Sequence, residues 1–182
     1  MGTVVAMLRS VNVGGRNRLA MADLRALVSS LGFADATTYL QSGNVVFTAR
    51  GSAPAAARAI ESRLTADLGL AVPVMARSAS QLRTVLDGNP LASGHVDPKT
   101  IHVTFLAGRP AGRTVTELER LAGQFGDDRF EVSGTHVYLH CPGGYGETKL
   151  NNAYLEQRLG VTATTRNWRT VRALAELCGL QT

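Results

Sequence analysis

The sequence predicts an α+β protein made of two tandem ferredoxin-like halves, each with the element order β-α-β-β-α-β, and an extra C-terminal helix. Two observations lead to this prediction. Short apolar runs rich in β-branched residues alternate with segments of helical periodicity, and this order occurs twice along the chain. The length of 182 residues is also sufficient for two small domains. We therefore expect a first half at residues 1–77, a linking helix and loop at 78–99, and a second half with the C-terminal helix at 100–182.

The first half carries a signal for each expected element. An apolar run at residues 3–9 is typical of a buried strand, and apolar residues at helical spacing from Met21 to Leu31 indicate a helix. The pair Ser42-Gly43 between two strand-like runs predicts a hairpin with a two-residue turn. Pro54 fits the first turn of a second helix that Gly69 ends. The predicted strands are 3–9, 37–41, 44–48 and 72–77, and the predicted helices are 21–31 and 54–68.

The second half repeats this order after a linking helix at 78–86 and a loop rich in Gly, Pro and Ser at 88–98. Ser133-Gly134 marks the second hairpin. The predicted strands are 100–106, 129–132, 136–140 and 161–165, and the predicted helices are 114–121, 148–159 and 168–178. The apolar faces of these elements predict core positions at Leu24, Leu27, Leu31, Val46 or Phe47, Phe105, Leu118 and Leu139.

Composition excludes several classes of protein. The chain is 45% hydrophobic and 18% charged, which is typical of a folded domain rather than a disordered one. No apolar run approaches the roughly 18 residues that a membrane span needs, and the first residues lack the basic segment of a signal peptide. Two cysteines are too few for a disulfide framework. We expect a cytoplasmic protein with no membrane association, no metal and no cofactor.

The charge is mildly basic, with a formal net charge of +5. Lys99 and Lys149 are the only lysines, so the excess consists of arginine. Arginine binds phosphate and carboxylate in two-point fashion better than lysine does. A GC-rich genome, which raises Ala, Gly and Arg together, explains the same composition, and both explanations stay open.

The segment RSVNVGGRNR at residues 9–18 is a first candidate for an anion site. Glycine lets backbone N–H groups point into one concavity, and arginine supplies positive charge around it. The segment has neither the spacing of a phosphate-binding P-loop nor that of a dinucleotide fingerprint. The alternative is an ordinary loop with solvated arginines. The candidate residues are Arg9, Asn12, Gly14, Gly15, Arg16 and Arg18.

The start of the last predicted helix is a second candidate. Asn167 is a plausible N-cap, but Arg166 and Arg169 flank it without an acid in the first turn. Helix N-termini carry partial positive charge, so this arrangement is unfavourable unless an anion sits there. A phosphate or carboxylate ligand explains it, and so does an internal ion pair, for example with Asp35 or Glu147.

Two further polar groups are weaker candidates. The segment CPGGYGETK at residues 141–149 leads into a predicted helix with Lys149 at its start, which resembles a phosphate-binding loop in composition but not in spacing. Tyr39, Gln41 and Asn44 gather at the first hairpin, where ordinary turn chemistry also explains them.

The histidines do not form a metal site within one strand. His136 and His140 stand four residues apart on a predicted strand, about 13 Å from each other, whereas a metal holds its ligands at about 2 Å. With Tyr138, His102 and Thr104 they could form an exposed sheet face that stacks single-stranded RNA bases, although the aromatic pattern of RNA-binding modules is absent.

Three stretches resemble an uncharacterised bacterial family, domain of unknown function number 1697. They are LRSVNVGG at residues 8–15, TYLQSGNVVF at 38–47 and TTRNWRTV at 164–171. The resemblance covers nearly the whole chain, from Val4 to about Leu177, and one departure is Ser10, where the family usually has Gly. It implies ferredoxin-like halves and a cytosolic bacterial protein, and it implies no established activity.

We predict that the protein is a binding module for an anionic ligand, bearing phosphate or carboxylate, or for nucleic acid. The first and second candidates are expected to meet in one anion site. One alternative is an enzyme that acts on a phosphorylated or carboxylated small molecule through Tyr39, Asn44, Lys149 and Asn167; another is a purely structural or interaction protein. The sequence does not indicate an oligomeric state.

Overall fold

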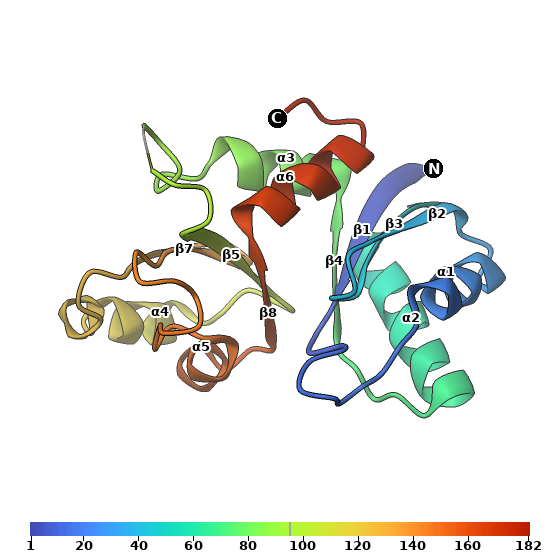
Figure 1. The fold of residues 1–182 in the computed structure, drawn as a ribbon, viewed down its shortest axis with the longest axis horizontal. Coiled ribbons are helices and arrows are strands. Elements are labelled where there is room, and N and C mark those ends of the chain that lie inside the picture. The colour runs from blue at the N-terminus through green and yellow to red at the C-terminus, as the bar shows by residue number, and fades with distance from the viewer. Residues whose placement is uncertain (95) are drawn as a thin grey trace. The chain divides into compact units, whose positions relative to one another are not determined.

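The computed structural model describes residues 1–94 and 96–182. The chain divides into two compact units, which are described separately: unit 1 comprises Met1–Thr84 and Leu174–Thr182, and unit 2 comprises Val85–Ala173. Within the described residues there are two four-stranded antiparallel sheets and six α-helices, so the fold is mixed α+β (Figure 1).

Unit 1 contains the sheet with strand order β2-β3-β1-β4. Helices α1 and α2 pack against each other and against strands of this sheet (Figure 1). Helix α2 has Pro54 in its first turn and ends at the left-handed Gly69, as the sequence predicts, and its N-cap is Ser52. The elements are β1 (Gly2–Leu8), α1 (Met21–Ser30), β2 (Ala34–Tyr39), β3 (Asn44–Ala49), α2 (Ala53–Leu68), β4 (Val74–Ser78) and the first part of α3 (Ala79–Asp87).

The core of unit 1 lies between the sheet and these two helices. Alternate residues of β1 and β3 face it, and Phe33 stacks on Phe47 with ring centroids 4.8 Å apart. The core residues predicted for this half are buried, except that Leu31 is only partly buried against the cluster. The main contributors are Val4, Ala6, Leu8, Leu24, Leu27, Val45, Phe47, Ile60 and Leu64.

Unit 2 repeats the element order around a sheet with strand order β6-β7-β5-β8. Helices α4 and α5 pack against each other (Figure 1), and residues from α4, α5 and the sheet form a second core that contains Leu118, Leu139 and Leu155. The elements are the last part of α3, β5 (Ile101–Leu106), α4 (Gly112–Glu119), a 3-10 turn (Ala122–Gln124), β6 (Arg129–Ser133), β7 (His136–His140), α5 (Asn152–Leu159), β8 (Ala163–Asn167) and the first part of α6 (Trp168–Leu177).

Two predicted boundaries are wrong: backbone conformation explains the first, and hydrogen bonds explain the second. The first hairpin turn has four residues, 40–43, rather than two, because Leu40 joins Gly43 in a left-handed conformation. Helix α5 begins at Asn152 rather than at residue 148. The Thr148 hydroxyl accepts a bond from the Leu150 N–H and donates one to Asp128, so these residues stay outside the helix, and Asn151 caps it by accepting from the Tyr154 N–H at 3.1 Å.

The expected histidine and tyrosine face is also wrong. His102 lies opposite Leu139 in the register of β5 and β7, whereas His136 and Tyr138 lie opposite Phe105 and Val103. Cross-strand partners share a face, so His102 is on the other side of the sheet. His136 and Tyr138 are buried, and the Tyr138 hydroxyl donates to the Val85 carbonyl at 3.0 Å, so they offer no exposed stacking surface.

Residues 174–182 belong to unit 1 although they follow unit 2 in the sequence. The Arg83 guanidinium donates to the Gln181 carbonyl at 2.8 Å, which ties this segment to the first part of α3. In the part of the chain that the structure describes, none of the helices combines the length and the apolar character needed to cross a membrane.

Candidate functional site

The predicted site residues divide between the two units. Unit 1 holds Arg9, Asn12, Gly14, Gly15, Arg16, Arg18, Tyr39, Gln41 and Asn44; unit 2 holds Lys149, Arg166, Asn167 and Arg169. The residues of each unit form a group of their own. That the two groups share one anion site stays a prediction.

In unit 1, the side chain of Asn12 holds the loop between β1 and α1 in shape. Its amide nitrogen donates to the Leu19 carbonyl and to the Gln41 carbonyl, both at 2.8 Å, and its amide oxygen accepts from the Leu19 N–H at 2.9 Å. Asn12 therefore closes the loop at residues 12–19 and also joins it to the hairpin turn at 40–43. The loop is fixed by its own hydrogen bonds.

The glycine pair forms the tip of this loop. The Arg16 N–H donates to the Val13 carbonyl at 3.1 Å, and Gly14 and Gly15 both have positive φ, +58° and +75°. This pattern is that of a type I′ turn, which needs a left-handed conformation at both central residues. The glycines are therefore explained by a tight turn that presents Arg16, rather than by an anion-binding nest.

The hairpin turn at 40–43 packs closely on the loop. The Gly43 carbonyl accepts from the Leu8 N–H at 2.8 Å, and the buried Asn44 amide donates to the Tyr39 carbonyl at 2.9 Å and to the Ser42 hydroxyl at 3.0 Å. Asn44, like Asn12, serves the local fold. The charged side chains that are exposed in these two segments are those of Arg16 and Arg18.

Left-handed backbone conformations concentrate in these two segments. Among the described residues, five non-glycine residues have positive φ, and Ser10, Asn12, Asn17 and Leu40 lie here. Ser10 has a φ of +54° at the position where the resembling family usually has Gly. Glycine adopts this conformation without the penalty that a Cβ atom brings, so the departure keeps the shape of the turn at some loss of stability.

Arg16 and Arg18 are exposed, and neither forms an ion pair with any residue that the structure describes. Other arginines do have acidic partners, such as Arg63 with Asp67 at 3.0 Å in the same unit. A fixed loop that carries exposed arginines without acidic neighbours can bind an oxyanion by charge-assisted hydrogen bonds.

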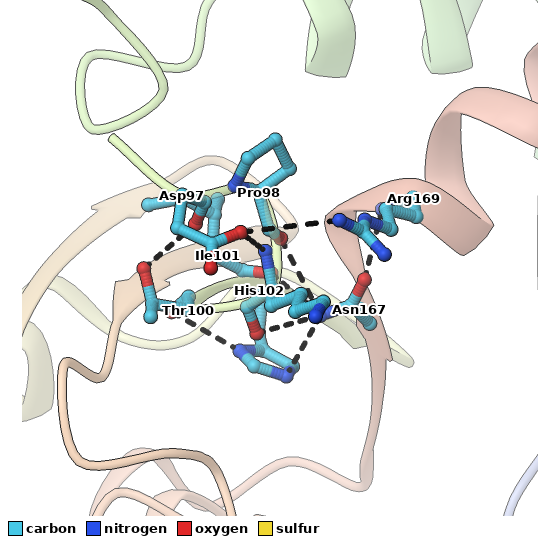
Figure 2. A network of polar contacts seen from close by, with 8 residues as sticks. Asp97, Pro98, Thr100, Ile101, His102, Asn167 and Arg169 are labelled. Atoms are coloured by element: carbon cyan, nitrogen blue, oxygen red, sulfur yellow. Dashed lines mark hydrogen bonds and ion pairs between the residues drawn. The ribbon is translucent and has the colours of Figure 1, made fainter. Parts of the chain in front are cut away.

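In unit 2, Asn167 lies at the centre of a polar network (Figure 2). Its amide oxygen accepts from the Arg169 N–H at 3.0 Å, which makes it the N-cap of α6, as predicted. Its amide nitrogen lies 2.9 Å from the Lys99 carbonyl oxygen and 3.3 Å from Nε2 of His102. Asn167 therefore joins the start of α6 to residues 98–102 and caps the helix at the same time.

Arg169 forms an internal ion pair, which is the alternative that the sequence left open, but its partner is Asp97 rather than Asp35 or Glu147. The Arg169 guanidinium lies 4.0 Å from the Asp97 carboxylate, and both side chains are more than half exposed (Figure 2). Exposed pairs of this kind contribute about 0–1 kcal/mol to stability. Asp97 thus places a negative charge near the start of the helix, and the ion pair stabilises the fold only slightly.

Arg166 is buried, and it has a counterpart in unit 1. Arg166 lies opposite Val103 in the register of β8 and β5, and Arg77 lies opposite Val5 in the register of β4 and β1. Each donates from its guanidinium to the preceding carbonyl, at 2.9 Å for Arg166 and 2.8 Å for Arg77. Burial lowers the pKa of each arginine to about 10, so both remain charged at pH 7. The repeated position indicates a structural role.

His102 is a network member that the sequence did not place in the candidate anion site. The Asn167 amide nitrogen can only donate and the Thr100 carbonyl can only accept, so Nε2 of His102 accepts and Nδ1 donates at 3.3 Å. The ring also stacks on Tyr145, with centroids 4.8 Å apart. Burial lowers the pKa of His102 below its usual value, although the bond to Thr100 opposes this effect.

Acid is therefore expected to weaken unit 2 through His102. A histidine whose pKa falls on folding contributes full stability above its usual pKa of about 6.5, and this contribution is lost as the pH falls below that value. Urea denaturation of the wild type and of His102→Phe, which keeps a ring next to Tyr145, measures the effect. The free energy of unfolding of the wild type should fall more between pH 7 and pH 5 than that of the variant. Parallel pH dependences would contradict the assignment.

The remaining candidates lie outside the two open pockets that the structure describes within the units. Lys149 is exposed in the segment before α5. An open pocket of about 440 Å³ in unit 2 is lined by residues of α4 and of the β6–β7 hairpin, and one of about 300 Å³ in unit 1 lies between α1 and α2. Neither is lined by a predicted site residue. In the described part of the chain, no group of three or more His, Cys, Asp or Glu residues is placed to hold a metal ion.

Comparison with known proteins assigns the chain to a family. The model of a family described as "Protein of unknown function (DUF1697)" matches residues 1–138. The chain belongs to the DUF1697 family. The match includes the loop at 9–18 and the first hairpin of this DUF1697 protein, and the helix start at 164–171 lies beyond the matched range. The resemblance seen in the sequence is confirmed.

A solved structure shows a similar fold. The conserved bacterial protein SP0830 from Streptococcus pneumoniae matches with a TM-score of 0.71 and 20% sequence identity, over 97% of this chain and 98% of that chain. None of the curated proteins matches the DUF1697 chain. The similarity to SP0830 concerns the fold over nearly the whole chain, and it does not assign an activity to this protein.

Proposed function

We propose that this DUF1697 protein is a binding module for an anionic ligand that carries phosphate or carboxylate groups, as a small molecule or as part of a larger partner such as a nucleic acid. The observation that carries the proposal is the loop at 9–18, whose shape is fixed by Asn12 and whose exposed Arg16 and Arg18 have no ion-pair partner among the described residues. Binding then requires little further ordering of the loop.

The charge distribution of the chain supports this site. Residues 1–60 contain six arginines, and Asp23 and Asp35 are the only acids among them. A region with this imbalance attracts anions by its field as well as by direct contact. We propose that Arg9 belongs to the same site, and that the exposed Lys149 and Arg169 bind anions in unit 2.

We also propose that each unit is a ferredoxin-like half, with the halves at residues 1–77 and 100–182 joined by 78–99. The support is the element order β-α-β-β-α-β in both units and the matching strand orders β2-β3-β1-β4 and β6-β7-β5-β8. A cytoplasmic location fits the two free cysteines, Cys141 and Cys178.

Binding is favoured over catalysis by the hydrogen bonds of two asparagines. The enzyme alternative needs Asn44 and Asn167 at a substrate, but both amides already bond to the protein's own backbone. In the loop at 9–18, by contrast, the guanidinium groups of Arg16 and Arg18 are available to bind a ligand. Arginine is well suited to bind phosphate and carboxylate groups.

Thermal melting in phosphate against chloride at matched ionic strength tests the proposal. Phosphate should raise the melting temperature of the wild type, because a ligand that binds only the folded state stabilises it by mass action. The rise should be largely lost in Arg16→Ala/Arg18→Ala and kept in Arg58→Ala, which removes an exposed arginine from helix α2 of the same unit. An equal rise in all three proteins would overturn the site.

A second pair of variants tests the contribution from unit 2. Arg169→Ala and Lys149→Ala should each reduce the phosphate effect slightly, because both side chains are exposed cations of unit 2. No change in either variant would confine the site to the loop at 9–18.

A further inference from the structure

We propose that unit 1 carries a docking surface for an acidic peptide segment with aliphatic side chains. The docking surface consists of Val13, Arg16 and Arg18 on the loop between β1 and α1, and Leu40 on the facing hairpin turn; the loop is the dark blue segment after β1 in Figure 1. The inference rests on the proposed function, because it uses the same arginines, and it names the class of partner.

Two aliphatic side chains are exposed beside the arginines. Val13 is 62% exposed and Leu40 is 54% exposed. They are neighbours in sequence of Asn12 and Gln41, which are joined by a hydrogen bond of 2.8 Å from the Asn12 amide to the Gln41 carbonyl. The two aliphatic residues therefore lie on adjoining turns, and a single segment of partner can contact both.

The conformation of Leu40 makes its side chain hard to explain within the chain alone. Its φ of +58° is one that glycine and asparagine adopt readily and that leucine adopts rarely. Neither local conformation nor burial favours leucine at this position. An apolar contact with a partner would explain a leucine at this strained and exposed position.

The surface is also fixed before any partner arrives. The Asn12 bonds, the type I′ turn at 13–16 and the bond from the Leu8 N–H to the Gly43 carbonyl hold the two turns together. A preformed surface loses less conformational entropy on binding than a flexible one.

Charge and side-chain chemistry together select the occupant. Arg16 and Arg18 favour a partner that carries carboxylate or phosphate groups. Val13 and Leu40 favour a partner that carries apolar side chains. Single-stranded nucleic acid supplies phosphate, but its bases stack mainly on aromatic rings, and it has no aliphatic side chain to pack against Val13 and Leu40. An acidic peptide with leucine, isoleucine or valine between its carboxylates supplies both groups.

Chemical-shift titration of the 15N-labelled full chain tests the proposal with two peptides of equal charge, acetylated and amidated ELEELE and ESEESE. We expect ELEELE to shift residues 12–18 and 40–43 and to bind at least about fivefold more tightly than ESEESE, because its leucines bury apolar area. Leu40→Asn and Val13→Ser should each reduce this preference. Leu68→Asn, at an exposed leucine of helix α2, should not.

Leu40→Asn separates a binding role from a structural one. Asparagine suits the left-handed conformation, so this variant should melt at or above the temperature of the wild type while losing affinity for ELEELE. A variant that melts lower and binds ELEELE as well as the wild type does would overturn the inference.

Inorganic phosphate and a six-nucleotide thymidine oligonucleotide distinguish the remaining outcomes. If phosphate binds through Arg16 and Arg18 but ELEELE shows no preference over ESEESE, the peptide partner is wrong and the proposed function stands. If neither phosphate nor either peptide binds, both are wrong. Tighter binding of the oligonucleotide than of ELEELE would overturn the peptide in favour of a nucleic acid.

Discussion

Replacing Leu24 by alanine is expected to lower the free energy of unfolding by about 3–5 kcal/mol, the upper part of the range for truncation of a core leucine. Leu24 lies in helix α1, is fully buried and belongs to the core between the helices and the sheet of unit 1. Its removal leaves a cavity that the neighbouring strands cannot fill, because a paired sheet is held by its register.

Leu27, one turn further along α1, should show a smaller loss of about 2–3 kcal/mol, since its neighbours can relax more freely. Leu27 is 6% exposed and lines the open pocket of about 300 Å³ between α1 and α2. Arg25→Ala, at an exposed position of the same helix, serves as the control and should change stability by no more than about 0.5 kcal/mol. Equal effects of all three variants in urea denaturation would show that the inward face of α1 is assigned wrongly.

Gly43→Ala is expected to destabilise unit 1 by about 2–4 kcal/mol, from two separate causes. The φ of Gly43 is +76°, so any side chain there is strained. An added Cβ would also stand 2.9 Å from Cβ of Leu8 and 3.3 Å from Cβ of Val11, which are not the flexible ends of side chains. Relief of this clash requires β1 and the hairpin turn to move apart, and the bond between Leu8 and Gly43 would lengthen.

Gly134→Ala provides the matched control in the second hairpin. Gly134 has a φ of +58°, but nothing lies within 4 Å of the position of an added Cβ. The variant should therefore lose only the roughly 1 kcal/mol that a left-handed conformation costs. Similar losses in the two variants, measured by the same denaturation experiment, would show that the close approach of Gly43 to Leu8 is unimportant.

The order of the elements was predictable from the sequence because it depends on local signals. Helix α2 has a capping serine, an early proline and a terminal glycine, so both of its ends are predicted correctly. The start of α5 was not predictable in this way, because Thr148 bonds to Asp128, twenty residues earlier. The face on which His102 lies depends on the register between β5 and β7, which no local pattern specifies.

The candidate site was predictable in its charges and not in its shape. Arg16 and Arg18 were predicted as site residues from the sequence, and both are exposed in the structure. The role of Asn12 depends on a bond to the Gln41 carbonyl across 29 residues, and the partner of Arg169 is Asp97, far away in the sequence. Leu40 carried no local signal, because the sequence predicts it within the strand at 37–41, where a leucine is ordinary.

The assignment of residues 174–182 to unit 1 has a consequence for the order in which the protein is made. A ribosome synthesises residues 1–84 first, and small domains often fold as soon as they emerge. Here the segment that contains Gln181, the partner of Arg83, is made only after the whole of unit 2. A nascent chain halted when α3 has left the exit tunnel but residues 174–182 have not been made should therefore be open to proteolysis at α3, and unit 1 should gain full resistance only when residues 174–182 are also outside the tunnel.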